Sequence, residues 1–459
     1  MQRLTKINNK VIDNLLALIV VFVSITGWYS LDYIGGMSMF WGIFILVSIA
    51  IFLLVVIKCN IKIEAREFFR KKFNILFLLY LTYMSISYLC NYQGMSTILY
   101  ICKMWVIVIV YYFIINIYMS NILEDGKKNL INRMCKYIFI LGSVHVFLGM
   151  YQYIILSNDF LWFTLTTWPA YNPASLYGNV NGLGTYLFIS IAAGFYCVAN
   201  TFNNKYKTVV VFFLVAQMYM LYLTIARTSI VVTILYVCLV PILFFIKDKK
   251  IFYNVINRKT LITIVISYCI LLSIVNYAKI GNFVESIIKP NTEHRDTRKQ
   301  ARKTIDMLDE KNSKGFNQRQ FIWKAVIKDY KQYIVIGDGL KYNIVNKINV
   351  EEVISKRSKG VTRISYHNTL FRYFASNGLI GLGVFLILYA FIPLSLLLKM
   401  IKEKRLCVKY SMVIIFMACI FLYMQMEEVY LGEIGFVPMV LLIVMAYANT
   451  LLSDEVKSS

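Results

Sequence analysis

Three basic side chains in this sequence are of the types needed to act on a phosphorylated substrate. His367 follows a long polar segment and directly precedes an apolar stretch, and its imidazole can accept a proton from a hydroxyl near neutral pH. Arg319 opens a segment with helical periodicity, and Arg227 lies between two apolar runs with almost no loop around it. A guanidinium offers a planar fork of donors that suits phosphate oxygens. These residues predict proton transfer beside a bound anion.

Two further cations strengthen the expectation of an anionic ligand: Lys103 as a buried cation within an apolar run, and Arg372 shortly after His367. Each residue also has a simpler interpretation. His367 could cap the helix that follows it, and Arg319 could be a solvated or snorkelling arginine. Acidic side chains late in the chain could neutralise several of the cations: Glu427, Glu428 and Glu433.

The elements that must position these residues are apolar helices. Hydrophobic residues make up 59% of the 459 residues and charged residues 16%, and the mean hydropathy is +0.63, which excludes a soluble domain. Runs of roughly 17 to 25 mostly apolar residues can cross a hydrocarbon core of about 30 Å. The sequence therefore predicts an all-α polytopic membrane protein with about twelve transmembrane helices. We place them at residues 11–27, 39–57, 74–90, 98–119, 136–157, 182–199, 208–225, 229–246, 260–277, 379–398, 409–426 and 435–452.

Lys and Arg are concentrated in alternate connections between these runs. The other short connections contain neither residue: 28–38, 91–97, 158–181 and 427–434. The positive-inside rule then places both termini in the cytoplasm and the polar segment 279–366 outside the cell. Much of the formal charge of +24 is accounted for by this topology. It is no indication of a nucleic-acid partner.

We divide the chain at the long polar excursion, because a membrane protein gains no stability from so large a charged segment. The division is 1–278 with the first nine transmembrane helices, 279–378 as a large extracytoplasmic loop, and 379–459 with the last three. Within the loop, residues 318–334 have the spacing of an amphipathic helix. Residues 367–376 are expected to form a short interfacial or re-entrant helix, broken at Asn377-Gly378.

The nine cysteines and three histidines show no paired metal-ligand spacing and no disulfide framework. We therefore expect no metal site.

Five motifs in this order resemble the O-antigen ligase and O-antigen polymerase superfamily, over roughly residues 170–400. They are Gly178-Asn179-Val180-Asn181-Gly182-Leu183-Gly184, Leu223-Thr224-Ile225-Ala226-Arg227, Arg319-Gln320-Phe321-Ile322-Trp323-Lys324-Ala325 with Gly337-Asp338-Gly339, His367-Asn368-Thr369-Leu370, and Asn377-Gly378-Leu379-Ile380-Gly381. The sequence departs from the family pattern at Ala226, where a serine is usual, and in lacking a proline ahead of Gly337.

The resemblance implies a GT-C-like membrane glycosyltransferase that needs no metal or other cofactor, because pyrophosphate is already an activated leaving group. His367 would be the general base that deprotonates a sugar hydroxyl of the acceptor. Arg319 and Arg227 would hold the pyrophosphate of an undecaprenyl-linked glycan and stabilise its charge as it leaves. Weaker expectations for the substrate-binding site are Arg372, Lys103, Asn181, Asn179 and Asn368.

The resemblance further implies a multi-pass protein of the bacterial cell (inner) membrane with an extracytoplasmic active site. Its partners would be the lipid-linked oligosaccharide and the bilayer, with a flippase and a chain-length regulator as candidates. We favour a polysaccharide polymerase, because richness in Ile, Asn, Lys and Tyr indicates an AT-rich genome, common among Gram-positive hosts that lack lipid A–core. A ligase that transfers the glycan to lipid A–core is the alternative. A flippase of the same lipid-linked glycan and a purely structural membrane partner rank behind both.

Overall fold

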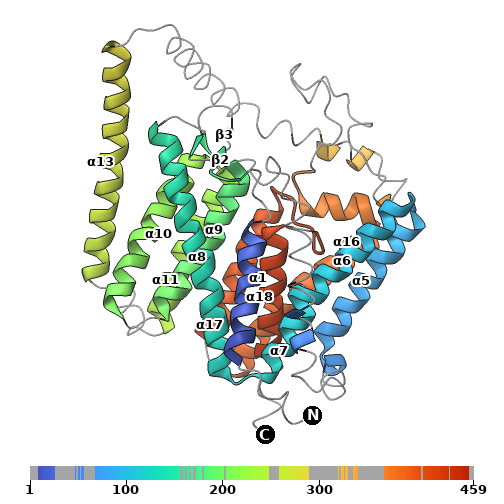
Figure 1. The fold of residues 1–459 in the computed structure, drawn as a ribbon. Coiled ribbons are helices and arrows are strands. Elements are labelled where there is room, and N and C mark those ends of the chain that lie inside the picture. The colour runs from blue at the N-terminus through green and yellow to red at the C-terminus, as the bar shows by residue number, and fades with distance from the viewer. Residues whose placement is uncertain are drawn as a thin grey trace. The chain divides into compact units, whose positions relative to one another are not determined.

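The computed structural model is predominantly helical, and the following account is confined to the residues it describes (Figure 1). They are 9–25, 47, 50–51, 53–55, 68–155, 159–160, 163–164, 167–168, 172–177, 180–200, 203–247, 258–288, 319, 322–324, 326–328, 334–339, 366–404, 407–433 and 435–453.

The chain contacts define two compact units, each made of segments that are distant in sequence. Unit 1 comprises Met1–Leu54 and Ile122–Glu310, and unit 2 comprises Val55–Asn121 and Lys311–Ser459. Unit 2 therefore combines early helices with the end of the chain. This grouping follows packing, whereas the division expected from the sequence followed the polar excursion.

Unit 1 contains six described helices and two very short hairpins. The helices are α1 (Asn9–Ile25), α8 (Glu124–Ile155), α9 (Val180–Ala199), α10 (Asn204–Thr224), α11 (Arg227–Lys247) and α13 (Arg258–Ile288). The strands pair antiparallel, β1 (Asp159–Phe160) with β2 (Phe163–Thr164) and β3 (Thr167–Trp168) with β4 (Asn172–Pro173). Asp159 lies opposite Thr164 in the first hairpin, and Thr167 lies opposite Pro173 in the second.

Unit 2 contains the helices that carry the candidate base. They are α5 (Lys72–Cys90), α6 (Met95–Val108), the π-helix η2 (Ile109–Ile114), α7 (Ile115–Asn121), α16 (Thr369–Lys402), α17 (Val408–Met424) and α18 (Phe436–Ser453). The segment 319–328 is helical at every described position, as its amphipathic spacing predicts.

The predicted all-α class is confirmed for the described residues, apart from the two hairpins. All but the second of the predicted spans coincide with a helix, and the second falls largely outside the described residues. Six helical stretches there are long and apolar enough to cross a membrane: Lys72–Cys90, Met95–Asn121, Glu124–Ile154, Val180–Ala199, Lys205–Thr224 and Thr369–Lys402. Four more helical stretches are apolar but shorter: Val11–Ile25, Arg227–Leu243, Val408–Met424 and Phe436–Leu452.

Helix α8 begins at Glu124, well before the predicted span at residue 136. Hydropathy marks where a helix enters the apolar region, and it does not mark where the helix itself begins. The acidic residues Glu124 and Asp125 lie in the first turn, where they interact favourably with the helix dipole. Lys127 pairs with Glu124 at 3.0 Å. The basic segment expected as a connection is therefore the polar first part of a continuous helix.

The break expected at Asn377-Gly378 is present inside α16. Gly378 has φ 67° and ψ −170°, a conformation that essentially only glycine adopts. The turn 334–339 docks at this break, where Leu379 N–H donates to Ile334 O at 2.8 Å and Asp338 N–H donates to Ala375 O at 2.9 Å. Helix α5 fixes the turn from the other side, since Ser87 Oγ donates to Ile336 O at 2.7 Å. The break thereby holds the first half of α16 in place.

Gly378→Ala is expected to destabilise unit 2, because the new Cβ would lie 2.1 Å from Val335 O in a backbone conformation closed to alanine. The expected cost is about 1–3 kcal/mol or more. Thermal unfolding of the purified full-length protein in detergent measures it. The matched control is Gly383→Ala in the same helix, where nothing lies within 4 Å of the added methyl group. Equal melting temperatures for the two variants would contradict this account of the break.

Candidate functional site

His367 lies at the turn that leads into α16 and has a left-handed backbone with φ 50°. A non-glycine residue adopts this conformation at a cost of about 1–2 kcal/mol, so the neighbouring backbone must be held firmly. Tyr366 provides the anchor, since its carbonyl accepts from Trp323 Nε1 at 3.0 Å and its N–H donates to Glu428. The turn is therefore tied both to the amphipathic segment and to the loop between α17 and α18.

Asn368 caps α16 and is buried. Its Oδ1 accepts from the backbone N–H groups of Leu370 and Phe371 at 2.8 and 3.1 Å, which is the usual arrangement of a helix N-cap. Its Nδ2 donates to Gln425 O at 2.9 Å. Both polar ends of this side chain are thus used within the protein. Asn368 therefore positions the helix after His367, and its part in binding substrate stays a prediction.

Arg319 and His367 meet at a single carboxylate, that of Glu427. Arg319 Nη2 lies 3.1 Å from Glu427 Oε1, and His367 Nδ1 lies 3.6 Å from Glu427 Oε2. Arg319 Nη1 also donates to Met426 O at 2.7 Å. The His367 side chain is 34% exposed and that of Arg319 is 20% exposed, whereas the His367 Nδ1 atom itself is buried. Two of the three residues predicted to carry the chemistry are thus neighbours on one unit.

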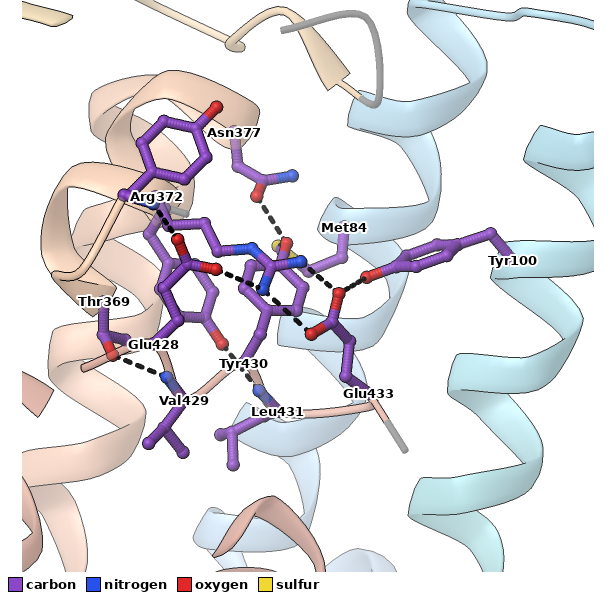
Figure 2. A network of polar contacts seen from close by, with 12 residues as sticks. Met84, Tyr100, Thr369, Arg372, Asn377, Glu428, Val429, Tyr430, Leu431 and Glu433 are labelled. Carbon is purple, nitrogen blue, oxygen red and sulfur yellow. Dashed lines mark hydrogen bonds and ion pairs between the residues drawn. The ribbon is translucent and has the colours of Figure 1, made fainter. Parts of the chain in front are cut away.

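Arg372 is held in a dense ionic network (Figure 2). Its guanidinium contacts Glu428 Oε2 at 3.1 Å and both carboxylate oxygens of Glu433, and it lies 4.6 Å from the ring centre of Tyr430. Tyr100 donates to the Glu433 carboxylate at 3.1 Å. The Arg372 side chain is only 9% exposed, and two carboxylates face one guanidinium. The structure therefore shows the alternative in which acidic residues neutralise Arg372, and its part in binding pyrophosphate stays a prediction.

Tyr430 also belongs to this network, because the Arg372 guanidinium lies over its ring. Burial raises the pKa of Tyr430 well above its ordinary value, so the hydroxyl stays protonated and donates to Asn377 Oδ1 at 2.5 Å. The Tyr430 ring stacks on Tyr373, with centroids 4.4 Å apart. Asn377 adjoins the helix break at Gly378, so this hydrogen bond links the ionic network to the break.

Arg372→Met is expected to destabilise the protein by about 3 kcal/mol, because it leaves two largely buried carboxylates without their cation. Denaturation of the purified protein measures this. Lys103→Met removes a cation of unit 2 that is exposed on α6, so it should leave stability unchanged. An Arg372→Met protein that is stable but cannot bind substrate would instead support a part for Arg372 in substrate binding.

Lys103 was expected to be a buried cation of the binding site. The expected burial is wrong, and its part in binding stays a prediction. Its side chain lies on the exposed side of α6. Long cationic side chains on such a face reach toward the membrane surface with their charged ends, and an apolar run in the sequence does not reveal which face a single lysine occupies.

Unit 1 brings two of the predicted motifs together. Gly184 lies so close to Ala226 that a methyl group added at Gly184 would be 2.4 Å from the Ala226 Cβ. The hydroxyl groups of Thr185 and Ser229 lie 3.5 Å apart. The segment after Asn181 in α9 therefore packs against the start of α11. Asn179 lies outside the described residues.

Arg227 is the first residue of α11 and is exposed. It lies two residues after Ile225, the C-cap of α10, which has a left-handed conformation with φ 55°. The start of a helix favours anions, and an arginine there adds a full positive charge. Arg227 and Asn181 belong to unit 1, whereas His367 and Arg319 belong to unit 2. The predicted meeting of Arg227 with the other two residues therefore stays a prediction.

The sequence assigned Glu427 only as a residue that could neutralise nearby cations. Its adjacency to Glu428, in a connection without Lys or Arg, was the available signal. The two neighbouring carboxylates serve different groups in the structure: Glu427 contacts Arg319 and His367, and Glu428 contacts Arg372 and the Tyr366 N–H. Such a division depends on which way each side chain points, and sequence alone does not reveal it.

Comparison with known proteins supports the resemblance read from the motifs. Residues 184–386 match the family model described as O-antigen ligase. Among curated proteins, no match to the chain was found. Arg227, Arg319, His367 and the break in α16 at Gly378 all fall within the matched segment. The predicted resemblance to the O-antigen ligase and polymerase superfamily is confirmed over this segment. The match implies an enzyme of the membrane glycosyltransferase type and does not distinguish a ligase from a polymerase.

Proposed function

We propose that this protein is a polysaccharide polymerase, which transfers a glycan from an undecaprenyl-pyrophosphate donor to a sugar hydroxyl of a lipid-linked acceptor. The observation that carries the proposal is the joint contact of His367 and Arg319 with Glu427. A base for the attacking hydroxyl and a cation for the departing diphosphate are the two groups that this transfer requires.

The transfer needs one proton movement and one exchange of bonds. His367 accepts the proton of the acceptor hydroxyl, the hydroxyl oxygen bonds to the anomeric carbon of the donor sugar, and the bond from that carbon to the phosphate oxygen breaks. The electron pair leaves with the undecaprenyl pyrophosphate. Arg319, together with Arg227 of unit 1, would bind the diphosphate and stabilise the added charge. Such stabilisation is worth about 3–4 kcal/mol per well-placed donor.

We infer that the shorter apolar helices also cross the bilayer, so that the chain has about twelve spans in a GT-C-like arrangement. The positive-inside pattern supports cytoplasmic termini and an extracytoplasmic site in the bacterial cell membrane. An outward-facing site suits a donor delivered by a flippase, and a chain-length regulator would be a further partner.

A ligase that uses lipid A–core as acceptor would share the same base and arginines. The composition of the chain, which is rich in Ile, Asn, Lys and Tyr, favours the polymerase. A flippase is disfavoured because such a protein is expected to have cations through the middle of its spans and short loops, whereas the cations singled out here are expected to cluster at one face beside the long polar segment.

Deletion of the gene separates the three activities. Loss of a polymerase should leave single repeat units on the lipid, facing outward and accessible to added enzymes. Loss of a ligase should instead leave long chains attached to undecaprenyl pyrophosphate, and loss of a flippase should trap single repeats on the cytoplasmic face. Mass spectrometry of extracted lipid-linked glycans, before and after treatment of intact spheroplasts with a glycosidase, distinguishes these results. Either of the last two patterns would overturn the polymerase assignment.

A further inference from the structure

We propose that Glu427 is a positioning residue, a carboxylate shared between Arg319 and His367 that orients the imidazole for proton transfer and passes from the arginine to the histidine when the diphosphate binds. The inference rests on the proposed function, in which Arg319 binds the donor and His367 is the base. It assigns to the acidic residue a part in the reaction that neutralisation of charge alone does not include.

The contact with Glu427 distinguishes the two ring nitrogens of His367. Nδ1 is buried and lies 3.6 Å from Glu427 Oε2, whereas the side chain as a whole is 34% exposed. A carboxylate beside Nδ1 favours the tautomer with its proton on Nδ1. Nε2 is then left as the atom that accepts the proton from the acceptor hydroxyl. The imidazolium that results is stabilised by the same carboxylate.

The two distances at Glu427 show which cation holds it in this structure. Oε1 lies at hydrogen-bonding distance from Arg319, 3.1 Å, whereas Oε2 remains 3.6 Å from His367, beyond a hydrogen bond. A diphosphate on Arg319 would compete directly with the carboxylate for the guanidinium. Glu427, released in part, needs to move only a fraction of an ångström to reach Nδ1. Binding of the donor would thereby complete the orientation of the base.

Two further acidic residues and one arginine of the described part of the chain lie near this site and are engaged with other groups. Glu428 accepts from the Tyr366 N–H and contacts Arg372, and Arg372 in turn contacts Glu433. Glu428 thereby holds the backbone just before His367, whereas Glu427 contacts the imidazole itself. A change in the tautomer of His367 after substitution of Glu427 would therefore report on this contact.

Histidine NMR of the full-length protein in nanodiscs tests, without any substrate, the proposal that Glu427 orients the His367 imidazole. The chain has three histidines, so the His367 signals can be assigned by their loss in His367→Gln. In Glu427→Gln, the Nδ1-protonated tautomer of His367 should lose population, because the anion beside Nδ1 is gone while Arg319 remains. Glu427→Asp should restore this tautomer in part. Glu403→Gln, which removes a carboxylate near Lys399, should leave the His367 tautomer unchanged. Unchanged His367 signals in a folded Glu427→Gln protein would overturn the proposal.

Binding of geranyl diphosphate, a short polyprenyl diphosphate, tests whether Glu427 and the diphosphate compete for Arg319. Glu427→Gln removes the competitor for Arg319, so the probe should bind as tightly as to the wild type or several-fold more tightly, although polysaccharide synthesis falls by about 10²-fold or more. Weaker binding by a folded Glu427→Gln protein would contradict the sharing. Wild-type binding by Arg319→Ala would instead refute the pyrophosphate assignment of the proposed function, and the NMR result would remain a separate test of the positioning.

Discussion

Cells that carry His367→Ala are expected to lose long polysaccharide chains and to accumulate single lipid-linked repeat units, while the variant inserts into the membrane at its normal level. A general base contributes about 10²–10⁴-fold to the rate, and no other described side chain at the Arg319–Glu427 contact can accept a proton in this way near neutral pH. The His367 side chain is partly exposed at the start of α16, so its removal should spare the fold. Gel separation of surface glycans and mass spectrometry of lipid-linked repeats measure the effect.

Stability should change little in this variant, because the turn is held by backbone contacts of Tyr366 and by the Asn368 cap rather than by the imidazole. Thermal unfolding of the purified protein supplies that control. His294→Ala, at the histidine of the preceding polar segment, is the matched substitution and should leave chain length as in the wild type. Long chains made by a His367→Ala protein would remove His367 as the base.

Arg319→Ala should lower the rate of chain elongation by about 10²–10³-fold, the usual effect of deleting one donor to a developing negative charge. Arg319→Lys should recover only part of this loss. The arginine uses Nη1 on Met426 O and Nη2 on Glu427, and a single ammonium group does not reproduce that fork. The same pair of substitutions at Arg227 should give the same order of effects if both arginines bind one diphosphate. Rates of elongation with membranes and labelled lipid-linked repeats measure both series.

Lys324→Ala is the matched control, since Lys324 is an exposed cation on the same amphipathic segment as Arg319. Its rate should equal that of the wild type, which would show that the effect at Arg319 is specific to the site and not to charge in the segment. Full elongation with alanine at Arg319 would exclude a part for this residue in diphosphate binding.

The sequence predicted those parts of the fold that depend on local pattern. Apolar runs identified nearly every described helix, and Asn377-Gly378 identified the break in α16 because glycine is needed at its backbone conformation. The start of α8 was missed, since polarity within a helix resembles polarity in a loop. The two hairpins near residues 159–173 were also missed, because strands of two residues carry no periodic signal.

Only some of the predicted site residues lie together, because the partner of a charged side chain depends on how distant segments pack. Motif spacing selected His367 and Arg319, which the structure brings together on Glu427. The expected convergence of cations also selected Arg372, which the structure pairs with Glu428 and Glu433. The three residues differ in which carboxylates of the loop between α17 and α18 they meet. The partner of a charged side chain is a property of that packing, which no local pattern contains.

The most direct test of the central claim is elongation by the purified protein in nanodiscs, supplied only with undecaprenyl-pyrophosphate-linked repeat units. The wild type should build a ladder of glycans and release one undecaprenyl pyrophosphate for every linkage formed. His367→Ala should bind the same lipid and produce neither ladder nor free undecaprenyl pyrophosphate. A ladder from His367→Ala, or the absence of undecaprenyl pyrophosphate release by an elongating wild type, would contradict transfer from a diphosphate donor with His367 as base.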